Sequence, residues 1–270
     1  MLLQQLLLLF LFSFSPQKEI PIPPQKVKVF DIQKDKSVEV YCENKSDQIQ
    51  SVKIKCQLTG MSPSRKFPMI VVIKPHSTKL ISVLKPKKSA RQYNYKYSYE
   101  FVDGNVNSKH DDSYIYNLPY KKGRSYILGQ GYNGHYSHHN SNSLDFNMDV
   151  GTPIHAMRGG KVVYVVEKNK KGCASSKCAK YANQIRIQHS DGTYADYYHL
   201  KYKGVIVNSG DQVKKGQHIG YSGNTGWTSG PHLHVKIYKA TFGRENPGFR
   251  TKFRTRRGAI YLKEKRSYSY

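Results

Sequence analysis

The segment PHLHV at residues 231–235 predicts a strand that carries two histidines on one face. Side chains at positions i and i+2 of a strand point to the same side of a sheet. His232 and His234 are therefore expected to meet in one site, while Leu233 and Val235 point into a core. Two neighbouring imidazoles suit a metal ion, or a metal ion together with a proton carrier.

Two residues outside this strand fit a metal-centred site. His199 ends a strand-like run, and Asp145 lies between two apolar residues, where an unpaired carboxylate would be costly to bury. One upstream histidine, Asp145 and one histidine of the HxH pair would give a three-ligand zinc site with a fourth position open to water. Zinc lowers the pKa of a bound water to roughly 7, so the site would hold a hydroxide nucleophile.

The base of such a reaction is expected to be a histidine. The H-E-x-x-H motif is absent, and Glu167 is the only glutamate between Ser125 and Tyr238. His199, His232 or both could transfer the proton, since the unperturbed pKa of histidine is about 6.5.

The motifs around these residues resemble those of the lysostaphin-type (LytM-like) zinc metallopeptidases. The resemblance covers residues 130–240 and includes VGTPIHA at 150–156, NQIRIQHSDGT at 183–193, GDQVKKGQ at 210–217 and GNTG at 223–226. It implies a β-sheet fold with an open groove, one zinc ion, and endopeptidase action on the peptides of bacterial peptidoglycan. By position, it implies Asp145 and His234 as zinc ligands and His199 and His232 as catalytic residues.

The first zinc ligand departs from the family's frequent pattern H-x-x-x-D. Ser141 stands four residues before Asp145, whereas His138 and His139 stand seven and six residues before it. Family members with a longer spacing usually carry this ligand in a Ser-His step, which favours His138.

Two other functions compete with hydrolysis. Residues 207–226 also resemble hairpins of biotinyl and lipoyl carrier domains, but a carrier has no need for three site histidines. A family member that binds or regulates at the cell wall without cutting it is the main alternative. Zinc content and hydrolysis of purified sacculi would separate these functions.

The whole chain is predicted to be all-β, with a small β-sandwich at 27–117 before a mostly antiparallel peptidase sheet at 125–240. Apolar and polar residues alternate through 38–42 and 52–58, as in half-buried strands. The sandwich has no catalytic cluster, so binding, positioning or scaffolding is its expected role. A basic extension at 241–270 is expected to add an edge strand or a flap.

The four cysteines predict the disulfides Cys42–Cys56 and Cys173–Cys178. An even number of cysteines suits an exported protein. Cys42 and Cys56 fall on the apolar phase of strands that could neighbour each other, and Cys173 and Cys178 close a short loop. Free or metal-binding thiols are the alternative.

The N-terminal segment favours an exported protein of the periplasm, the cell envelope or the medium, whereas charge alone does not choose between nucleic acid and a bacterial envelope as partner. Residues 1–17 begin with an uncharged apolar run typical of a signal peptide, with a retained anchor as the alternative, and 18–26 form a linker. The net charge of +26, from 44 Lys and Arg against 18 Asp and Glu, attracts polyanions. No nucleic-acid-binding motif is present, so the expected partners are peptidoglycan and anionic envelope polymers.

Overall fold

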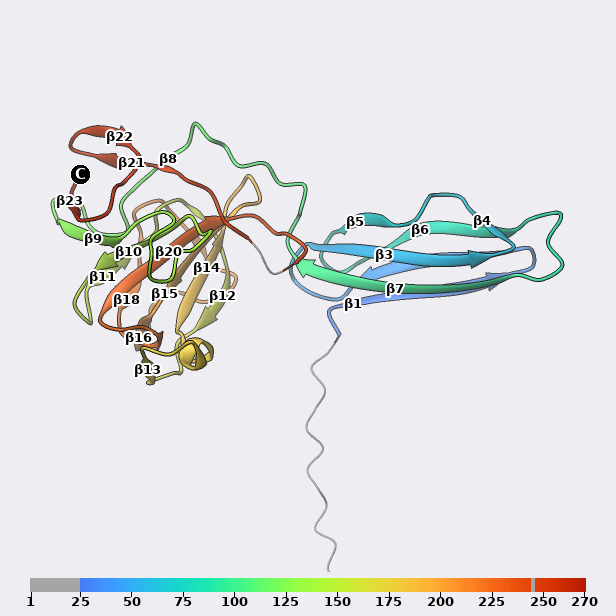
Figure 1. The fold of residues 1–270 in the computed structure, drawn as a ribbon, viewed down its shortest axis with the longest axis horizontal. Coiled ribbons are helices and arrows are strands. Elements are labelled where there is room, and N and C mark those ends of the chain that lie inside the picture. Colours follow the sequence, from blue (N-terminus) through green and yellow to red (C-terminus); the bar gives the residue numbers. More distant parts are fainter. Residues whose placement is uncertain (1–24, 244–245) are drawn as a thin grey trace, which may run out of the picture.

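The computed structural model describes residues 25–243 and 246–270 (Figure 1). These residues form strands and one short 3-10 helix, η1 (Ser176–Tyr181), which confirms the predicted all-β class. The predicted signal segment 1–17 and linker residues 18–24 lie outside the described residues. Within the described part, no helix has the length and apolar character needed to cross a membrane.

The N-terminal part is a sandwich of two antiparallel sheets (Figure 1). Its strands are β1 (Val27–Lys34), β2 (Ser37–Asn44), β3 (Gln50–Thr59), β4 (Met61–Pro63), β5 (Met69–Ile73), β6 (Ser77–Pro86) and β7 (Asn94–Asp103). One sheet has the order β1-β2-β6-β4 and the other the order β5-β3-β7. The alternation in β2 buries Val38, Val40 and Cys42 against the facing sheet, as the period of two requires.

The predicted Cys42–Cys56 disulfide is wrong, because both cysteines are free. Their apolar phase is as predicted, but β2 and β3 belong to opposite sheets. Cys42 lies two residues before the end of β2, and Cys56 lies six residues after the start of β3. This difference of four residues displaces them by roughly 13 Å along the strands. A disulfide needs Cα atoms about 4.4–6.8 Å apart.

The C-terminal part is built on an eight-stranded antiparallel sheet. Its strands, in spatial order, are β17 (Gln212–Val213), β12 (Gly160–Val166), β14 (Gln184–Gln188), β15 (Tyr194–Tyr198), β20 (His232–Tyr238), β10 (Ser143–Asn147), β9 (Tyr126–Gln130) and β23 (Arg266–Tyr268). A second sheet of β11 (Pro153–His155), β18 (His218–Ser222) and β16 (Leu200–Val205) shares one hydrophobic core with it. The mostly antiparallel arrangement is as predicted.

Two glycine-containing turns connect their strands in different ways. Gly192 adopts a φ of +79° in the turn between β14 and β15, which pair as an antiparallel hairpin. Gly159 and Gly160 do not form a hairpin, because the strands they connect, β11 and β12, lie in different sheets.

The basic C-terminal segment extends the sheet rather than forming a separate flap. β23 pairs antiparallel with β9 and becomes the edge strand of the eight-stranded sheet. Before it, β21 (Lys252–Thr255) pairs with β22 (Gly258–Ile260) and, in parallel, with β8 (Ile115–Tyr116). Tyr116 therefore belongs to the core of the C-terminal part, and the sandwich strands end with Asp103 at the end of β7.

A small contact joins the sandwich to the C-terminal part. Val102 and Val106 pack on a cluster formed by Val163, Tyr194 and Ala240. The side-chain amide of Gln48, in the β2–β3 loop, also donates to the backbone carbonyl of Val163 in β12 at 3.0 Å. The long axis of the sandwich points away from the eight-stranded sheet (Figure 1).

Candidate metal centre

Strands β10 and β20 place Asp145 directly opposite His234 in the sheet. β10 is buried on both faces from Ser143 to Phe146, so the Asp145 carboxylate is largely removed from water. Its Oδ1 lies 2.8 Å from Nδ1 of His234. A buried carboxylate needs such partners to offset its lost hydration.

His138 completes a group of three around this carboxylate. The loop at 131–141 folds back so that His138 is 1% exposed, with its Nδ1 donating to the carbonyl of Gly131 at 2.9 Å. Its Nε2 then lies 3.2 Å from both His234 Nδ1 and Asp145 Oδ1. His139, the other residue considered for this position, is exposed and outside the group.

The three atoms form a triangle with sides of 2.8, 3.2 and 3.2 Å. Ligands bound to one zinc ion at about 2.1 Å in a tetrahedral arrangement stand roughly 3.4 Å apart. Two imidazole nitrogens and one carboxylate oxygen also match the ligand types that zinc binds. The size and the chemistry of the group therefore fit a single ion.

The electrostatics of the group favour positive charge beside the carboxylate. Burial alone would raise the pKa of Asp145, but hydrogen bonds with His138 and His234 hold that pKa well below its usual value. Burial alone would lower the pKa of His138, and the neighbouring Asp145 more than reverses this effect. Asp145 is thus ionised at neutral pH, as a metal ligand must be.

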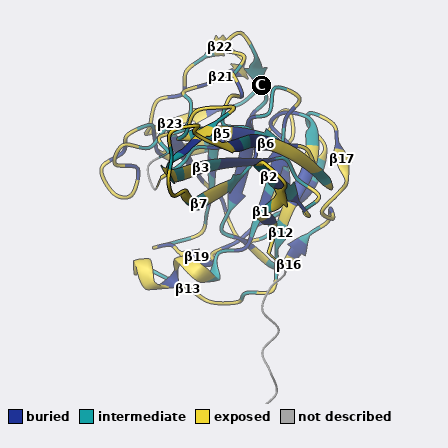
Figure 2. Cartoon of the chain, turned by 90° about the vertical axis from the view of Figure 1, so that its right-hand side faces the viewer, coloured by how far each residue is buried: buried dark blue, intermediate teal, exposed yellow. Residues whose placement is uncertain are grey.

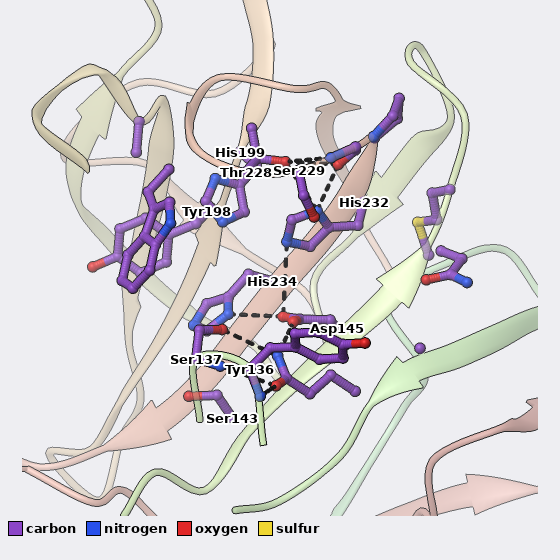
Figure 3. A pocket seen from close by; sticks show the side chains of 18 of the residues that line it. Tyr136, Ser137, Ser143, Asp145, Tyr198, His199, Thr228, Ser229, His232 and His234 are labelled. Atoms are coloured by element: carbon purple, nitrogen blue, oxygen red, sulfur yellow. Dashed lines mark hydrogen bonds and ion pairs between the residues drawn. The ribbon is translucent and has the colours of Figure 1, made fainter. Parts of the chain in front are cut away.

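His199 and His232 lie together beside this group (Figure 3). Their ring centres are 4.5 Å apart, and Nε2 of His232 is 3.9 Å from Asp145 Oδ1. Nδ1 of His199 donates to the carbonyl of Thr225 at 2.7 Å, and Nδ1 of His232 donates to the carbonyl of Gly230 at 2.8 Å. Because a carbonyl only accepts, each neutral ring leaves Nε2 free to take a proton.

The backbone and surroundings of His199 are unusual. Its φ of +64° lies in the left-handed region, which is rare for residues other than glycine and often marks a functional site. Burial, together with the nearby His232 and His234, lowers its pKa to about 3. The ring is therefore neutral over the physiological pH range.

A cavity of about 1130 Å³ opens over these residues. Asp145, His199, His232 and His234 line it, and its other lining residues are Tyr198, Lys236 and members of the segments 126–149, 174–182 and 227–231. The structure thus brings all five candidate residues to one place: four line the cavity, and His138 lies buried directly beneath.

Gln130 is a site residue that sequence reasoning missed. Its Nε2 donates to Asp145 Oδ2 at 2.8 Å and to Ser137 Oγ at 3.1 Å. Its Oε1 accepts the backbone N–H groups of Tyr136 and Ser137. One amide therefore ties Asp145 to the loop that carries His138. The available signal is a polar residue on the buried phase of β9, where every polar group needs a partner.

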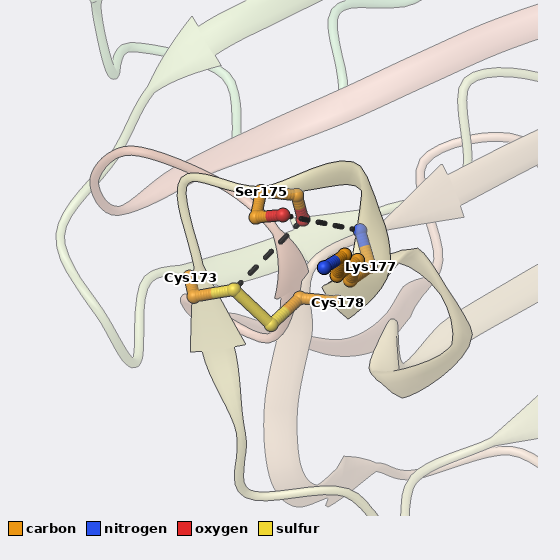
Figure 4. The surroundings of a disulfide bond; sticks show 4 residues. All are labelled: Cys173, Ser175, Lys177 and Cys178. Carbon is orange, nitrogen blue, oxygen red and sulfur yellow. Dashed lines mark hydrogen bonds between the residues drawn. A yellow bond between two sulfur atoms is a disulfide. The ribbon is translucent and has the colours of Figure 1, made fainter.

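The predicted Cys173–Cys178 disulfide is present, with a Cα–Cα distance of 5.9 Å (Figure 4). It closes the loop that leads from β13 (Gly172–Cys173) into η1. The helix beside β13 is mostly exposed (Figure 2), yet the loop also lines the cavity through Ala174, Ala179 and Ala182.

Comparison with known proteins identifies the class of this domain. Residues 139–247 match peptidase family M23, a segment that contains Asp145, His199, His232 and His234 and begins one residue after His138. The chain therefore carries a peptidase M23 domain, which confirms the resemblance to lysostaphin-type peptidases.

Curated relatives share this part of the chain. Glycyl-glycine endopeptidase ALE-1 of Staphylococcus capitis is 38% identical over 146 residues, which are 53% of this chain and 35% of the relative. Lysostaphin of Staphylococcus simulans is 40% identical over 121 residues, 43% of this chain and 21% of the relative. Peptidoglycan DD-endopeptidase ShyA of Vibrio cholerae is 36% identical over 96 residues, 36% of this chain and 20% of the relative. The chain thus spans about a third or less of these relatives.

Proposed function

We propose that this protein is a zinc-dependent endopeptidase that hydrolyses peptides of bacterial peptidoglycan. The observation that carries the proposal is the triangle of ligand atoms from His138, Asp145 and His234, with two further histidines beside it on the floor of an open cavity. Bound zinc would polarise the scissile carbonyl and activate a water molecule for attack.

The proposed roles of the chain's own residues follow from their hydrogen bonds. His138, Asp145 and His234 would hold the ion, and Gln130 would keep Asp145 oriented. Nε2 of His232 or His199 takes a proton from the attacking water and returns one to the leaving amine. The other ring would donate from Nε2 to the carbonyl oxygen as negative charge develops there, which requires a proton on Nε2 as well as on Nδ1.

Peptidoglycan as substrate is supported by the relatives' names. ALE-1 is named a glycyl-glycine endopeptidase and ShyA a peptidoglycan DD-endopeptidase. The relatives therefore support peptidoglycan as the substrate but do not identify which bond is cleaved. The net charge of +26 favours contact with an anionic envelope. The Cys173–Cys178 disulfide and the apolar segment at 1–17 support export. We assign the sandwich, as a separate domain, a binding or scaffolding role.

The test combines metal analysis with digestion of purified sacculi. We expect about one zinc per chain, release of soluble fragments, loss of release with a chelator, and recovery with added zinc. Mass spectrometry of the fragments would identify the bond. Full activity of metal-free protein would contradict the mechanism. A protein that binds zinc and sacculi but releases nothing would instead be the non-hydrolytic family member.

A further inference from the structure

The disulfide loop is joined to the segment that carries Trp227. β13 pairs in parallel with β19 (Gly226–Trp227), which sets Cys173 beside Trp227. The backbone N–H of Gly226 donates to the carbonyl of Lys171 at 2.9 Å, and that of Thr228 donates to the carbonyl of Cys173 at 3.0 Å. Through these bonds the loop fixes the backbone on both sides of Trp227.

Two glycines make this contact close. A Cβ added at Gly172 would stand 1.9 Å from the carbonyl oxygen of Asn224. Gly226 has a φ of +85°, and a Cβ there would stand 2.6 Å from Cβ of Ala182. Because neither position has space for a side chain, the loop and the Trp227 segment form one packed unit.

Trp227 is the only tryptophan of the chain, and 44% of it is exposed. It lines the same cavity as the candidate metal centre, together with Ala174, Ala179 and Ala182. The lysines of the same loop are exposed as well, but they do not line the cavity. An apolar strip within a concave site, next to polar catalytic groups, is typical of a ligand-binding surface.

We propose that Trp227 and the alanine side of the disulfide loop form a specificity wall for the substrate peptide. The flat indole packs against an extended peptide segment beside the three alanines of the loop. The Cys173–Cys178 bond keeps this wall in position. The inference rests on the proposed peptidase function and adds the part of the cavity that selects the peptide.

The kinetic test compares Trp227→Ala with Trp227→Phe on soluble peptidoglycan fragments. We expect Trp227→Ala to raise KM about tenfold with a much smaller change in kcat, because the wall binds substrate away from the reacting atoms. Trp227→Phe should recover most of the affinity. Zinc content should match the parent in both variants. The control is Tyr261→Ala, which removes an aromatic ring of 43% exposure outside the cavity and should leave KM unchanged.

Tryptophan fluorescence tests the wall without turnover. In a His232→Ala background, fragments should bind without being cut, and the emission of Trp227 should change in a saturable way. Replacing both Cys173 and Cys178 with serine should weaken this binding several-fold at unchanged zinc content.

Two results would contradict the proposed specificity wall. One is a KM of Trp227→Ala equal to that of the parent protein, and the other is Trp227 emission that stays constant while the fragments bind. Failure of the peptidase proposal would look different. The parent protein would then release no fragments or hold no zinc, whereas saturable emission changes would still support a peptide-binding wall.

Discussion

Strand β2 of the sandwich and strand β10 of the candidate metal centre bury different kinds of side chain. β2 buries an apolar row and leaves the intervening residues half-buried. β10 is buried on both faces and includes Asp145, which is surrounded by His138, His234 and Gln130. The burial of an apolar row stabilises a fold, because no polar group loses its hydration. The pattern in β10 is costly unless every polar atom has a partner, so it points to a function.

Buried polar groups also occur in the sandwich, but they have other partners. The side-chain amide of Asn44 donates to backbone carbonyls of Gln48, Ile73 and Lys74. These bonds hold the β2–β3 loop and the end of β5 against β2. In the C-terminal part, His138, Asp145 and His234 contact one another beside an open cavity. We therefore expect substitutions of buried sandwich residues to change stability and substitutions of this group to change metal binding and activity.

The largest effect is expected from removing a metal ligand. His138→Ala should lose both zinc and hydrolysis, since only two protein ligands remain. His139→Ala is the matched control, because its side chain is exposed and outside the ligand group, and it should behave like the parent. Zinc per chain, measured beside fragment release, checks both variants. The reverse result, with zinc lost only in His139→Ala, would show that the wrong neighbour was chosen.

Next in size is the loss of the two histidines that we propose transfer protons. His199→Ala and His232→Ala should keep their zinc but lower kcat by roughly 10²–10⁴-fold. His135→Ala, which removes an exposed histidine outside the cavity, should leave kcat unchanged. Rate and zinc content are measured on the same preparations. If either variant loses its zinc, that histidine belongs with the ligands instead.

In the sandwich, Ile54→Ala should cost about 2–5 kcal/mol of stability, because it leaves a cavity in a packed core. Zinc content and kcat of the folded protein should not change. Circular dichroism during denaturant unfolding reports both parts of the chain, whereas the fluorescence of Trp227 reports the C-terminal part. Lys55→Ala, an exposed neighbour on β3, is the control. A fall in zinc affinity would mean that the two parts are energetically coupled.

The smallest effect is expected at Gln130. Gln130→Ala should weaken zinc binding roughly 10–100-fold, as expected for a residue that orients a ligand. Gln50→Ala is its sandwich counterpart, because Gln50 is also buried and donates to Ser46 and Asp103. That variant should lose stability and keep its zinc affinity. Competition with a zinc-binding dye measures the zinc affinity of both variants. Equal zinc affinities in the two variants would argue against a positioning role for Gln130.

Local patterns predicted much of this architecture. Alternation identified the strands, and the HxH spacing put His232 and His234 on one face of β20, as the structure shows. Asp145 was recognisable because a carboxylate between apolar neighbours needs a partner. These features depend on a few consecutive residues, so the sequence displays them directly.

Long-range relations were not predictable in the same way. The phase of Cys42 and Cys56 is local, but whether they meet depends on the sheet to which β3 crosses. The loop that returns His138 to Asp145 depends on bonds from Gln130, and the pairing of β23 with β9 joins residues far apart in the chain. Tertiary packing decides such contacts, and hydrophobic periodicity carries little information about them.

The place of β23 has a consequence for the order in which the metal centre forms during synthesis. β9 and β10 are translated long before β20 and β23, the strands that flank them in the finished sheet. Until residues 232–238 have left the ribosome, Asp145 lacks His234, and until residues 266–268 follow, β9 has an unpaired edge. A nascent chain that ends before residue 234 therefore lacks one of the three residues that could hold the ion.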